Sequence, residues 1–287
     1  MDDGSLSSSD SPSSADQGED GCICVSTWNV NSIKARMPLL ATYLKTKHPD
    51  FMMLQEIKTQ SEAFPFFELE SMGYRCLVCG QKSYNGVALL SKHKTELVTD
   101  KLPDAPDNGE QARYIEAFCP DTNTLLISVY VPNGEPPAND LGSTERLDYK
   151  TAWLDALTER VKKLLRQDTP FIIGGDFNVI EYDTDVYDPA VFKDSVFTIP
   201  AVRNRFRAFY YTGLTNALRR IKQDAPVYSY WDYRAGAWER NNGILLDHLF
   251  LSPFWADRLI SAAVDTEIRE CEKTSDHAPL RGELSLQ

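Results

Sequence analysis

Polar side chains end or interrupt five apolar runs in this sequence. They are Asn29 after ICVSTW, Glu56 after FMMLQ, Asp176 and Asn178 after FIIGG, Asp247 within LLDHLFL, and Asp276 with His277 before the last apolar segment. A buried carboxylate is unfavourable unless it is paired or binds a metal ion. Five such positions at the ends of apolar runs therefore predict one shared site.

The motif GGDFN indicates how a strand can deliver two of these groups to one place. Residues i and i+2 of a strand face the same way, so Asp176 and Asn178 are predicted to project together from a strand end. Open sheets place their sites at the carboxyl ends of strands. A simple turn, with Gly174 and Gly175 making room, explains the same residues without chemistry, and the motif alone does not separate the two.

Hydrophobic periodicity predicts the elements that position these groups. Strands are expected at 23–29, 51–56, 86–92, 112–118, 124–132, 171–178 and 245–252, and helices at 37–48, 143–167 and 202–214. Pro38 then falls in a first helical turn, where proline is tolerated. A short helix from Pro253 and two closing strands complete the chain. Mixed hairpins and helices over about 260 residues predict an α/β sandwich of packed sheets with outer helices.

Composition limits the class of protein. The chain has 287 residues, 42% of them hydrophobic, which is enough for one large core. No apolar run approaches the length of about 18 to 20 residues that a membrane helix needs, and the first residues lack an export signal. We expect a soluble protein, cytoplasmic if bacterial and nuclear if eukaryotic. The six cysteines could form a zinc cluster, but reduced thiols fit a cytosolic-type protein better.

The first 21 residues are predicted to be a disordered acidic tail, which leaves residues 22–287 as one domain. The net charge of −12 opposes binding to nucleic acid. However, residues 1–20 carry six acids and no Lys or Arg, so the remainder carries 36 acids against 30 bases, or −6. This excess is small enough to allow a local basic face.

Residues 228–242, YSYWDYRAGAWERNN, combine aromatic rings with cations. Such a segment suits contact with DNA, because cations bind phosphates and rings stack or wedge. A core strand followed by a polar loop explains it equally well. We expect both, with Arg234, Trp238 and Arg240 meeting DNA. Arg113, at the start of a strand, is a further phosphate candidate.

Seven motifs resemble one known family. They are WNVNSIKAR, LQEIK, YVPNG, GGDFNV, YWDYRAG, LDHLFLSP and SDHAP. Their order and approximate spacing are similar to the exodeoxyribonuclease III family, the abasic-site endonucleases of the endonuclease/exonuclease/phosphatase fold. The resemblance covers roughly residues 22–286. It implies a DNase I-like four-layer α/β sandwich, in which two packed mixed β-sheets are flanked by helices.

The resemblance also implies roles for the polar residues. Glu56 becomes the principal ligand of Mg²⁺ or Mn²⁺, with Asn29, Asn31 and Asp276 close by. Asp176 would hold or deprotonate the attacking water, and Asn178 would position the phosphate. His277, kept charged and oriented by Asp247, would stabilise charge on the phosphoryl oxygens. Tyr130 and Asn133 would hold the phosphate from its other side. Without the resemblance, Tyr130 reads as an ordinary strand aromatic and His277 as half of a surface pair.

The implied substrate is double-stranded DNA with abasic sites or blocked 3′ ends. The oligomeric state is not readable from the sequence, and we expect a monomer. Tyr230, Ile244 and Leu246 would line a pocket for a flipped-out abasic sugar and refuse one carrying a base. This sequence departs from the family's pattern at Leu245, a position where the family usually has a basic residue. That lost charge puts the affinity for the DNA backbone in doubt more than the chemistry.

Two alternatives remain at this point. The same fold and ion could serve a phosphatase or phosphodiesterase acting on inositol phosphates, lipid head groups or RNA. Several of those branches carry a second histidine near the position of Tyr130, whereas this chain has none between His93 and His248. A non-catalytic DNA-binding relative is the other alternative, although all the implied catalytic residues are present.

Overall fold

Two six-stranded mixed sheets form the centre of the protein in the computed structural model, which describes residues 21–221 and 226–287. The first sheet contains, in spatial order, β11 (Leu259–Val264), β12 (Leu280–Ser285), β1 (Cys22–Asn29), β2 (Phe51–Gln55), β4 (Val87–Ser91) and β3 (Arg75–Cys79). The second contains β5 (Glu96–Thr99), β6 (Tyr114–Cys119), β7 (Thr124–Tyr130), β8 (Phe171–Asp176), β10 (Asp247–Leu251) and β9 (Thr215–Asn216). β1 pairs with β2 and β7 with β8 in parallel, and the other pairs are antiparallel.

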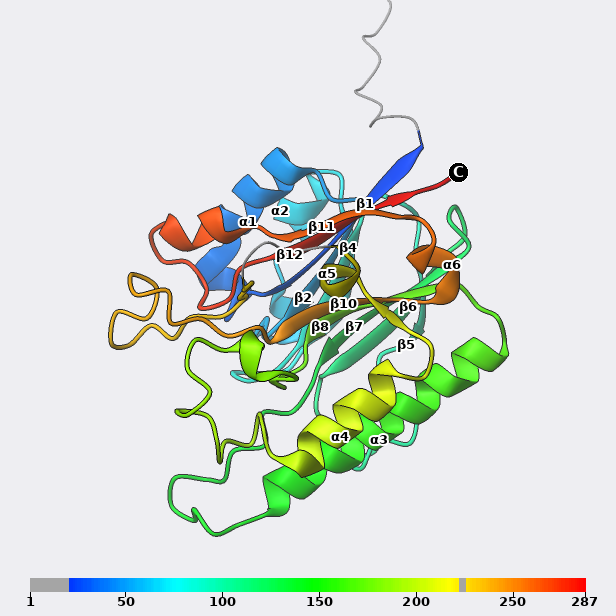
Figure 1. Ribbon diagram of the computed structural model, residues 1–287. Helices are drawn as coiled ribbons and strands as arrows, with labels where there is room; N and C mark the ends of the chain where they lie inside the picture. The colour runs from blue at the N-terminus through cyan, green and yellow to red at the C-terminus, as the bar shows by residue number, and fades with distance from the viewer. Residues whose placement is uncertain (1–20, 222–225) are drawn as a thin grey trace, which may run out of the picture.

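Helices cover the outer face of each sheet (Figure 1). The α-helices are α1 (Ile33–Lys47), α2 (Phe66–Glu70), α3 (Glu145–Arg166), α4 (Pro200–Tyr210), α5 (Ala217–Arg220) and α6 (Pro253–Ala256), and the 3₁₀-helices are η1 (Ser61–Ala63), η2 (Asp183–Asp185) and η3 (Thr266–Glu270). α3 and α4 pack against the second sheet through one apolar cluster, and α1 and α2 pack against the first through another. A third cluster fills the space between the sheets. The predicted four-layer sandwich is therefore confirmed.

Two local predictions need correction. The first helix begins at Ile33 rather than at residue 37, so Pro38 lies beyond the first turn. Because Pro38 lacks an N–H, the helix forgoes one backbone hydrogen bond there. Residues 228–234 do not form a strand of either sheet; Tyr230 instead makes isolated bridges to Ile244 and His277. Backbone bonds join this segment to Ile244 and Asp276.

Strand β10 presents different chemistry on its two faces. His248 is fully buried beside the rings of Phe206 and Phe250, and its Nδ1 lies 3.0 Å from Nδ2 of Asn216. Burial lowers the pKa of His248 well below its ordinary value. Asp247 points from the opposite face into the site described below. The predicted structural role of His248 agrees with this position.

Three expectations about the whole chain have different outcomes. The predicted tail, residues 1–21, lies outside the described residues except for Gly21. Within the described part, no helix is both long and apolar enough to span a membrane. All six cysteines are free thiols, and burial raises the pKa of Cys24, Cys76 and Cys79. The zinc-cluster alternative therefore gains no support.

Candidate active site

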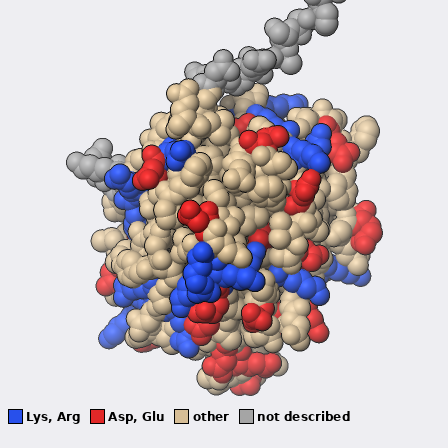
Figure 2. Space-filling view, turned by 90° about the vertical axis from the view of Figure 1, so that its right-hand side faces the viewer, with Lys and Arg blue, Asp and Glu red and all other residues tan. Residues whose placement is uncertain are grey.

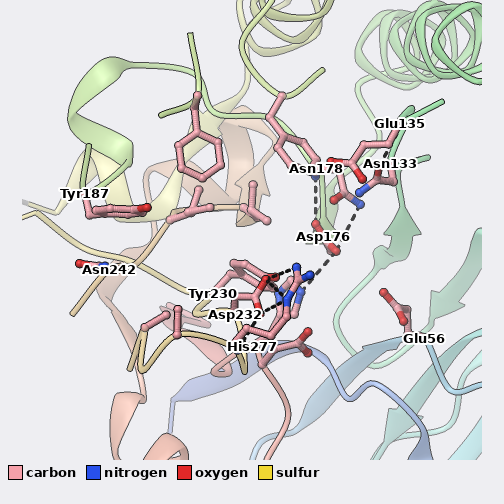
Figure 3. A pocket seen from close by; sticks show the side chains of 18 of the residues that line it. Glu56, Asn133, Glu135, Asp176, Asn178, Tyr187, Tyr230, Asp232, Asn242 and His277 are labelled. Atoms are coloured by element: carbon pink, nitrogen blue, oxygen red, sulfur yellow. Dashed lines mark hydrogen bonds and ion pairs between the residues drawn. The ribbon is translucent and has the colours of Figure 1, made fainter. Parts of the chain in front are cut away.

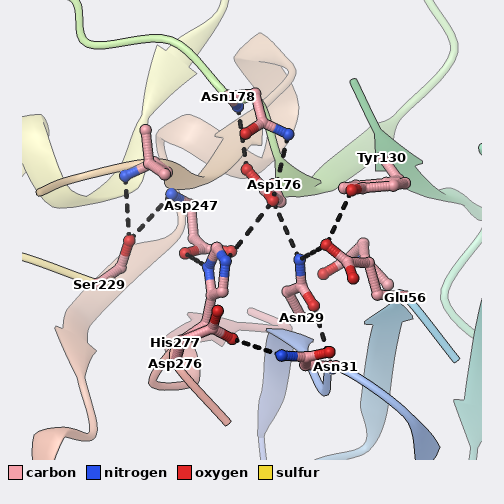
Figure 4. A network of polar contacts seen from close by, with 12 residues as sticks. Asn29, Asn31, Glu56, Tyr130, Asp176, Asn178, Ser229, Asp247, Asp276 and His277 are labelled. Carbon is pink, nitrogen blue, oxygen red and sulfur yellow. Dashed lines mark hydrogen bonds and ion pairs between the residues drawn. The ribbon is translucent and has the colours of Figure 1, made fainter. Parts of the chain in front are cut away.

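The site lies where several strands of both sheets end together. Asn29 and Tyr130 are the last residues of β1 and β7, and Asp176 is the last residue of β8. Glu56 directly follows β2. Asp247 begins β10, which is antiparallel to β8 and pairs Asp247 with Asp176 at the same edge. The predicted convergence of these polar groups is therefore observed (Figure 4).

Asp176 is the most connected carboxylate of the site. Its Oδ2 accepts a hydrogen bond of 3.0 Å from Nδ2 of Asn29, and its Oδ1 accepts one of 2.9 Å from the backbone N–H of Asn178. Burial raises the pKa of Asp176 to about 7, although the nearby charge of His277 opposes this shift. Asn178 lies beside Asp176 because its backbone adopts a left-handed conformation, with φ of 51°, after the strand has ended. The two groups meet through a turn, not through strand alternation.

Asp247 and His277 form a buried pair next to Asp176. Nδ1 of His277 lies 2.7 Å from Oδ2 of Asp247, and its Nε2 lies 3.7 Å from Oδ2 of Asp176. Burial lowers the pKa of His277, but the carboxylates of Asp247 and Asp176 outweigh that effect and raise it to about 10. The imidazole is therefore held as a cation at neutral pH.

Glu56 lies on the other side of Asp176. Its Oε1 accepts hydrogen bonds from the Tyr130 hydroxyl at 2.7 Å and from Asn29 Nδ2 at 3.0 Å. Burial raises its pKa, but the ammonium of Lys58 and the bond from Asn29 together hold it below the ordinary value. Glu56 is therefore ionised and available as an oxygen ligand.

The ammonium of Lys58 contacts side-chain oxygen atoms of both Glu56 and Asn31. The Lys58 ammonium lies 2.7 Å from Oε2 of Glu56 and 2.6 Å from Oδ1 of Asn31. Nδ2 of Asn31 in turn donates a hydrogen bond of 3.1 Å to Asp276. The described residues contain no cluster of three or more His, Cys, Asp or Glu side chains suited to a metal ion. Two carboxylates with amide oxygens fit Mg²⁺, which keeps several waters and a substrate phosphate as ligands.

A cavity of about 690 Å³ opens beside this network (Figure 3). Glu56, Asp176 and His277 line its polar side. Its apolar side is formed by Tyr187, Phe192, Phe197, Tyr230, Ile244 and Leu246. The cavity therefore joins a charged floor to an aromatic and aliphatic wall. The predicted pocket residues Tyr230, Ile244 and Leu246 all belong to that wall.

Comparison with known proteins agrees with this geometry. The model of the endonuclease/exonuclease/phosphatase family matches residues 26–277. The chain belongs to this family. Exodeoxyribonuclease III of Haemophilus influenzae is 29% identical over 90% of this chain and 98% of the relative.

Solved structures of family members extend the comparison. The 3′ phosphatase NExo from Neisseria, solved bound to a product DNA hairpin, is 35% identical, with a TM-score of 0.85 over 92% of this chain and 99% of the other. An AP endonuclease from Archaeoglobus fulgidus is 31% identical, with a TM-score of 0.83 over 91% and 98% of the two chains. The resemblance found from the seven motifs is therefore confirmed.

The predicted DNA contacts lie in different surroundings. Arg234 and Asn133 line the cavity, but the guanidinium of Arg234 is already bound to Asp232, with one contact of 2.7 Å. Trp238 is partly buried with its ring edge-on to Trp231. Arg113 lies over the ring of Tyr130, 4.7 Å from its centre, and Arg240 is exposed on the same loop as Trp238. Contact of these residues with DNA stays a prediction.

Leu245 lies two residues before β10, outside the strand. Its side chain is only 2% exposed and belongs to the apolar cluster between the sheets. The effect of this leucine on affinity for the DNA backbone stays a prediction.

Several site residues were not predicted from the sequence. Ser229 accepts the backbone N–H groups of Leu246 and Asp247 with its Oγ, and Ser275 Oγ donates to the carbonyl of Asn29 at 2.7 Å. Lys58 was within reach of prediction, because it lies in the LQEIK motif. Phe192 and Phe197 lie in an irregular segment without periodicity, so no pattern indicates them.

Proposed function

We propose that this chain is a divalent-metal-dependent DNA repair nuclease. It would hydrolyse the phosphodiester 5′ to abasic sites and process 3′ ends of duplex DNA as an exonuclease and phosphodiesterase. This proposal rests on one observation. A continuous polar network runs from Glu56 through Asn29 and Asp176 to His277, beside a cavity with an apolar wall. Relatives named as an exodeoxyribonuclease, an AP endonuclease and a 3′ phosphatase support this reaction class.

In this proposal, Asp176 holds the attacking water and accepts its proton. A pKa of about 7 suits a base that works near neutral pH. Water attacks phosphorus, and the bond from phosphorus to the 3′ oxygen of the preceding nucleotide breaks. That oxygen takes a proton from solvent water, which leaves a 3′-hydroxyl and a 5′-phosphate. The charged imidazole of His277, held by Asp247, stabilises negative charge on the phosphoryl oxygens.

Glu56 and Asp276, with the amide oxygens of Asn29 and Asn31, would hold Mg²⁺ or Mn²⁺. The ionised Glu56 and the carboxylate of Asp276, which is bonded by Asn31, offer the hard oxygen ligands that such an ion prefers. The ion supplies neutralisation of charge on the phosphate and on the leaving oxygen. Tyr130, Asn133 and Asn178 border the same cavity and would hold the phosphate from its other sides.

Incision of a labelled duplex with one central tetrahydrofuran abasic analogue tests the proposal. We expect nicking 5′ to the analogue with Mg²⁺ or Mn²⁺ and none with EDTA. Asp176→Asn is expected to lower kcat by about 10² to 10⁴-fold, because it removes the proton acceptor and keeps the shape of the side chain. An intact duplex is the control for non-specific cutting. A wild-type protein that does not nick with either ion would refute the proposal.

The same assay can rank the activities of the site. Recessed 3′ ends and 3′-phosphate ends are measured beside the abasic duplex at equal enzyme concentration. Phosphate release from inositol phosphates and cleavage of RNA are measured in parallel. We expect duplex DNA substrates to be preferred, because the aromatic and aliphatic wall suits an unstacked sugar better than a highly charged inositol phosphate. The opposite ranking would favour a phosphatase or phosphodiesterase of the same family.

A further inference from the structure

Lys150 is a buried cation to which the proposed mechanism assigns no role. It lies on α3 with a relative exposure of 0%. Its ammonium donates hydrogen bonds to the main-chain carbonyl oxygens of Asn133 at 2.8 Å and Asn178 at 2.6 Å. A longer contact of 3.4 Å reaches the carbonyl oxygen of Val196. An ammonium has three N–H donors, so these three carbonyls use its full capacity.

The three carbonyls come from three segments that border the cavity. Asn133 follows β7 and Asn178 follows β8, and both line the cavity (Figure 3). Val196 precedes Phe197, which also lines the cavity and whose ring centre lies 5.1 Å from the Lys150 ammonium. One side chain on the outer helix therefore joins three irregular segments of the site.

The backbone at Gly134, directly after Asn133, packs closely against the side chain of Lys150. Gly134 has a φ of 88°, which favours glycine, and an added Cβ would lie 2.7 Å from Cδ of Lys150. The turn after Asn133 therefore approaches the lysine side chain as closely as a backbone without a Cβ allows. Any shift of Lys150 would be transmitted directly to this turn.

Stability alone does not account for a charge in this position. Burial lowers the pKa of Lys150 to about 7, although the carboxylates of Asp176 and Glu135 oppose the shift. No carboxylate of the described residues forms an ion pair with Lys150, and its hydrogen bonds all go to loop carbonyls. The hydrogen bonds to the loop carbonyls are therefore the better explanation for a lysine here.

We propose that Lys150 is a positioning residue for the phosphate: it fixes the backbones of Asn133 and Asn178 so that both carboxamides face one phosphate. The lysine does not touch the substrate itself. This inference rests on the proposed function, which assigns both asparagines to phosphate binding. Replacement of Lys150 should therefore lower turnover more than it disturbs the overall fold.

The test compares Lys150→Met, Lys150→Arg and Lys163→Met by incision of the abasic duplex. Lys163→Met is the matched control, since Lys163 is an exposed residue of the same helix. We expect Lys150→Met to lower kcat by about 10- to 100-fold, because displacements of about 1 Å have effects of that size, with KM changed less. Lys150→Arg should recover much of the activity, as it restores charged donors. Lys150→Met leaves three carbonyl oxygens without this donor, so its thermal midpoint should fall, whereas that of Lys163→Met should stay close to wild type. Incision is therefore measured well below the lowest midpoint.

Hydrogen–deuterium exchange provides a readout that does not depend on activity. Lys150→Met should speed exchange in residues 131–135, 178–181 and 195–199, with the second half of α3 unchanged. Unchanged exchange there, or a kcat within about twofold of wild type, would overturn the inference. If Lys150→Met does not fold, Lys150→Gln is measured by the same criteria. Failure of wild type to nick any duplex would instead refute the proposed function, and the exchange result would still decide the role of Lys150.

Discussion

At the scale of single residues, the charge of His277 depends on its two carboxylate neighbours. Because the pKa of His277 is raised to about 10, above the ordinary value of about 6.5, its ion pairs stabilise the folded protein fully below pH 6.5. That contribution is lost as the pH rises through the folded pKa. The wild-type imidazole therefore stays protonated across the neutral range.

Asp247→Asn should move this loss to lower pH. The nearer carboxylate, 2.7 Å away, would be gone, so the pKa of His277 falls and its charge disappears within the neutral range. We expect kcat/KM of the variant to decrease as the pH is raised from about 6 to 9, beyond any change seen in wild type. Parallel pH–rate profiles measure this. Asp257→Asn, an exposed acid outside the cavity, serves as control, and a variant profile with the wild-type shape would contradict the prediction.

Asn29, Glu56, Asp176, Asp247 and His277 could be predicted from the sequence, because each ends or interrupts an apolar run, whereas Asn31 and Tyr130 came only from the resemblance. Asn178 shows the limit of that reasoning. It was expected beside Asp176 through strand alternation, but it arrives there through a left-handed turn. Ser229 and Ser275 could not be predicted, since a hydroxyl that accepts or donates one backbone bond has no sequence pattern.

At the scale of elements, the long helix α3 matched its predicted range within two residues at each end, because its apolar positions repeat over six turns. The segment between β8 and α4 was beyond prediction. It is held by contacts with distant residues, such as the backbone bonds from Phe177 to Leu246 and from Tyr187 to Gly243, and has no periodicity of its own. That segment supplies much of the cavity wall, so cavity shape could not be derived from the sequence.

A buried ion pair joins α3 to the second sheet. Glu116 of β6 is 0% exposed and accepts hydrogen bonds from Nε of Arg160 at 3.0 Å and from the Tyr114 hydroxyl at 2.6 Å. Arg160→Met would leave that carboxylate buried without its cation. We expect the free energy of unfolding to fall by about 3 to 5 kcal/mol, measured by urea titration.

The control for this prediction lies two residues further along the same helix. Lys162 pairs with Glu159 on the surface, and Lys162→Met should leave the urea midpoint unchanged within error. Equal effects of Arg160→Met and Lys162→Met would show that the buried pair does not stabilise the contact between α3 and β6.

At the scale of the whole molecule, charge is distributed unevenly along the chain. Figure 2 shows the face on the right of Figure 1, where basic and acidic side chains are interspersed. Half of the net charge of −12 belongs to residues 1–20. These acids should repel the phosphate backbone wherever the segment comes near bound DNA.

Deletion of residues 1–20 should therefore strengthen binding to duplex DNA. The gain is expected to be larger at about 50 mM salt than at about 200 mM, because salt screens repulsion between exposed charges. Fluorescence anisotropy of a labelled abasic duplex with Asp176→Asn protein measures it without cleavage. The control is the full-length protein with the six acids changed to Asn or Gln. Deletion of residues 1–20 from this variant should give no further gain in binding. A gain that does not depend on salt would contradict an electrostatic cause.

The two faces of β10 also constrain how the chain can fold. Pairing with β8 sets Asp247 opposite Asp176 and His248 opposite Gly175. A slip of one residue would turn the carboxylate into the phenylalanine cluster and the histidine toward the site. Both groups would then lose their partners, the imidazole its Asn216 and the carboxylate its His277. These two residues therefore also select the strand register, so a chain that folds stably has already brought Asp247 beside Asp176 and His277.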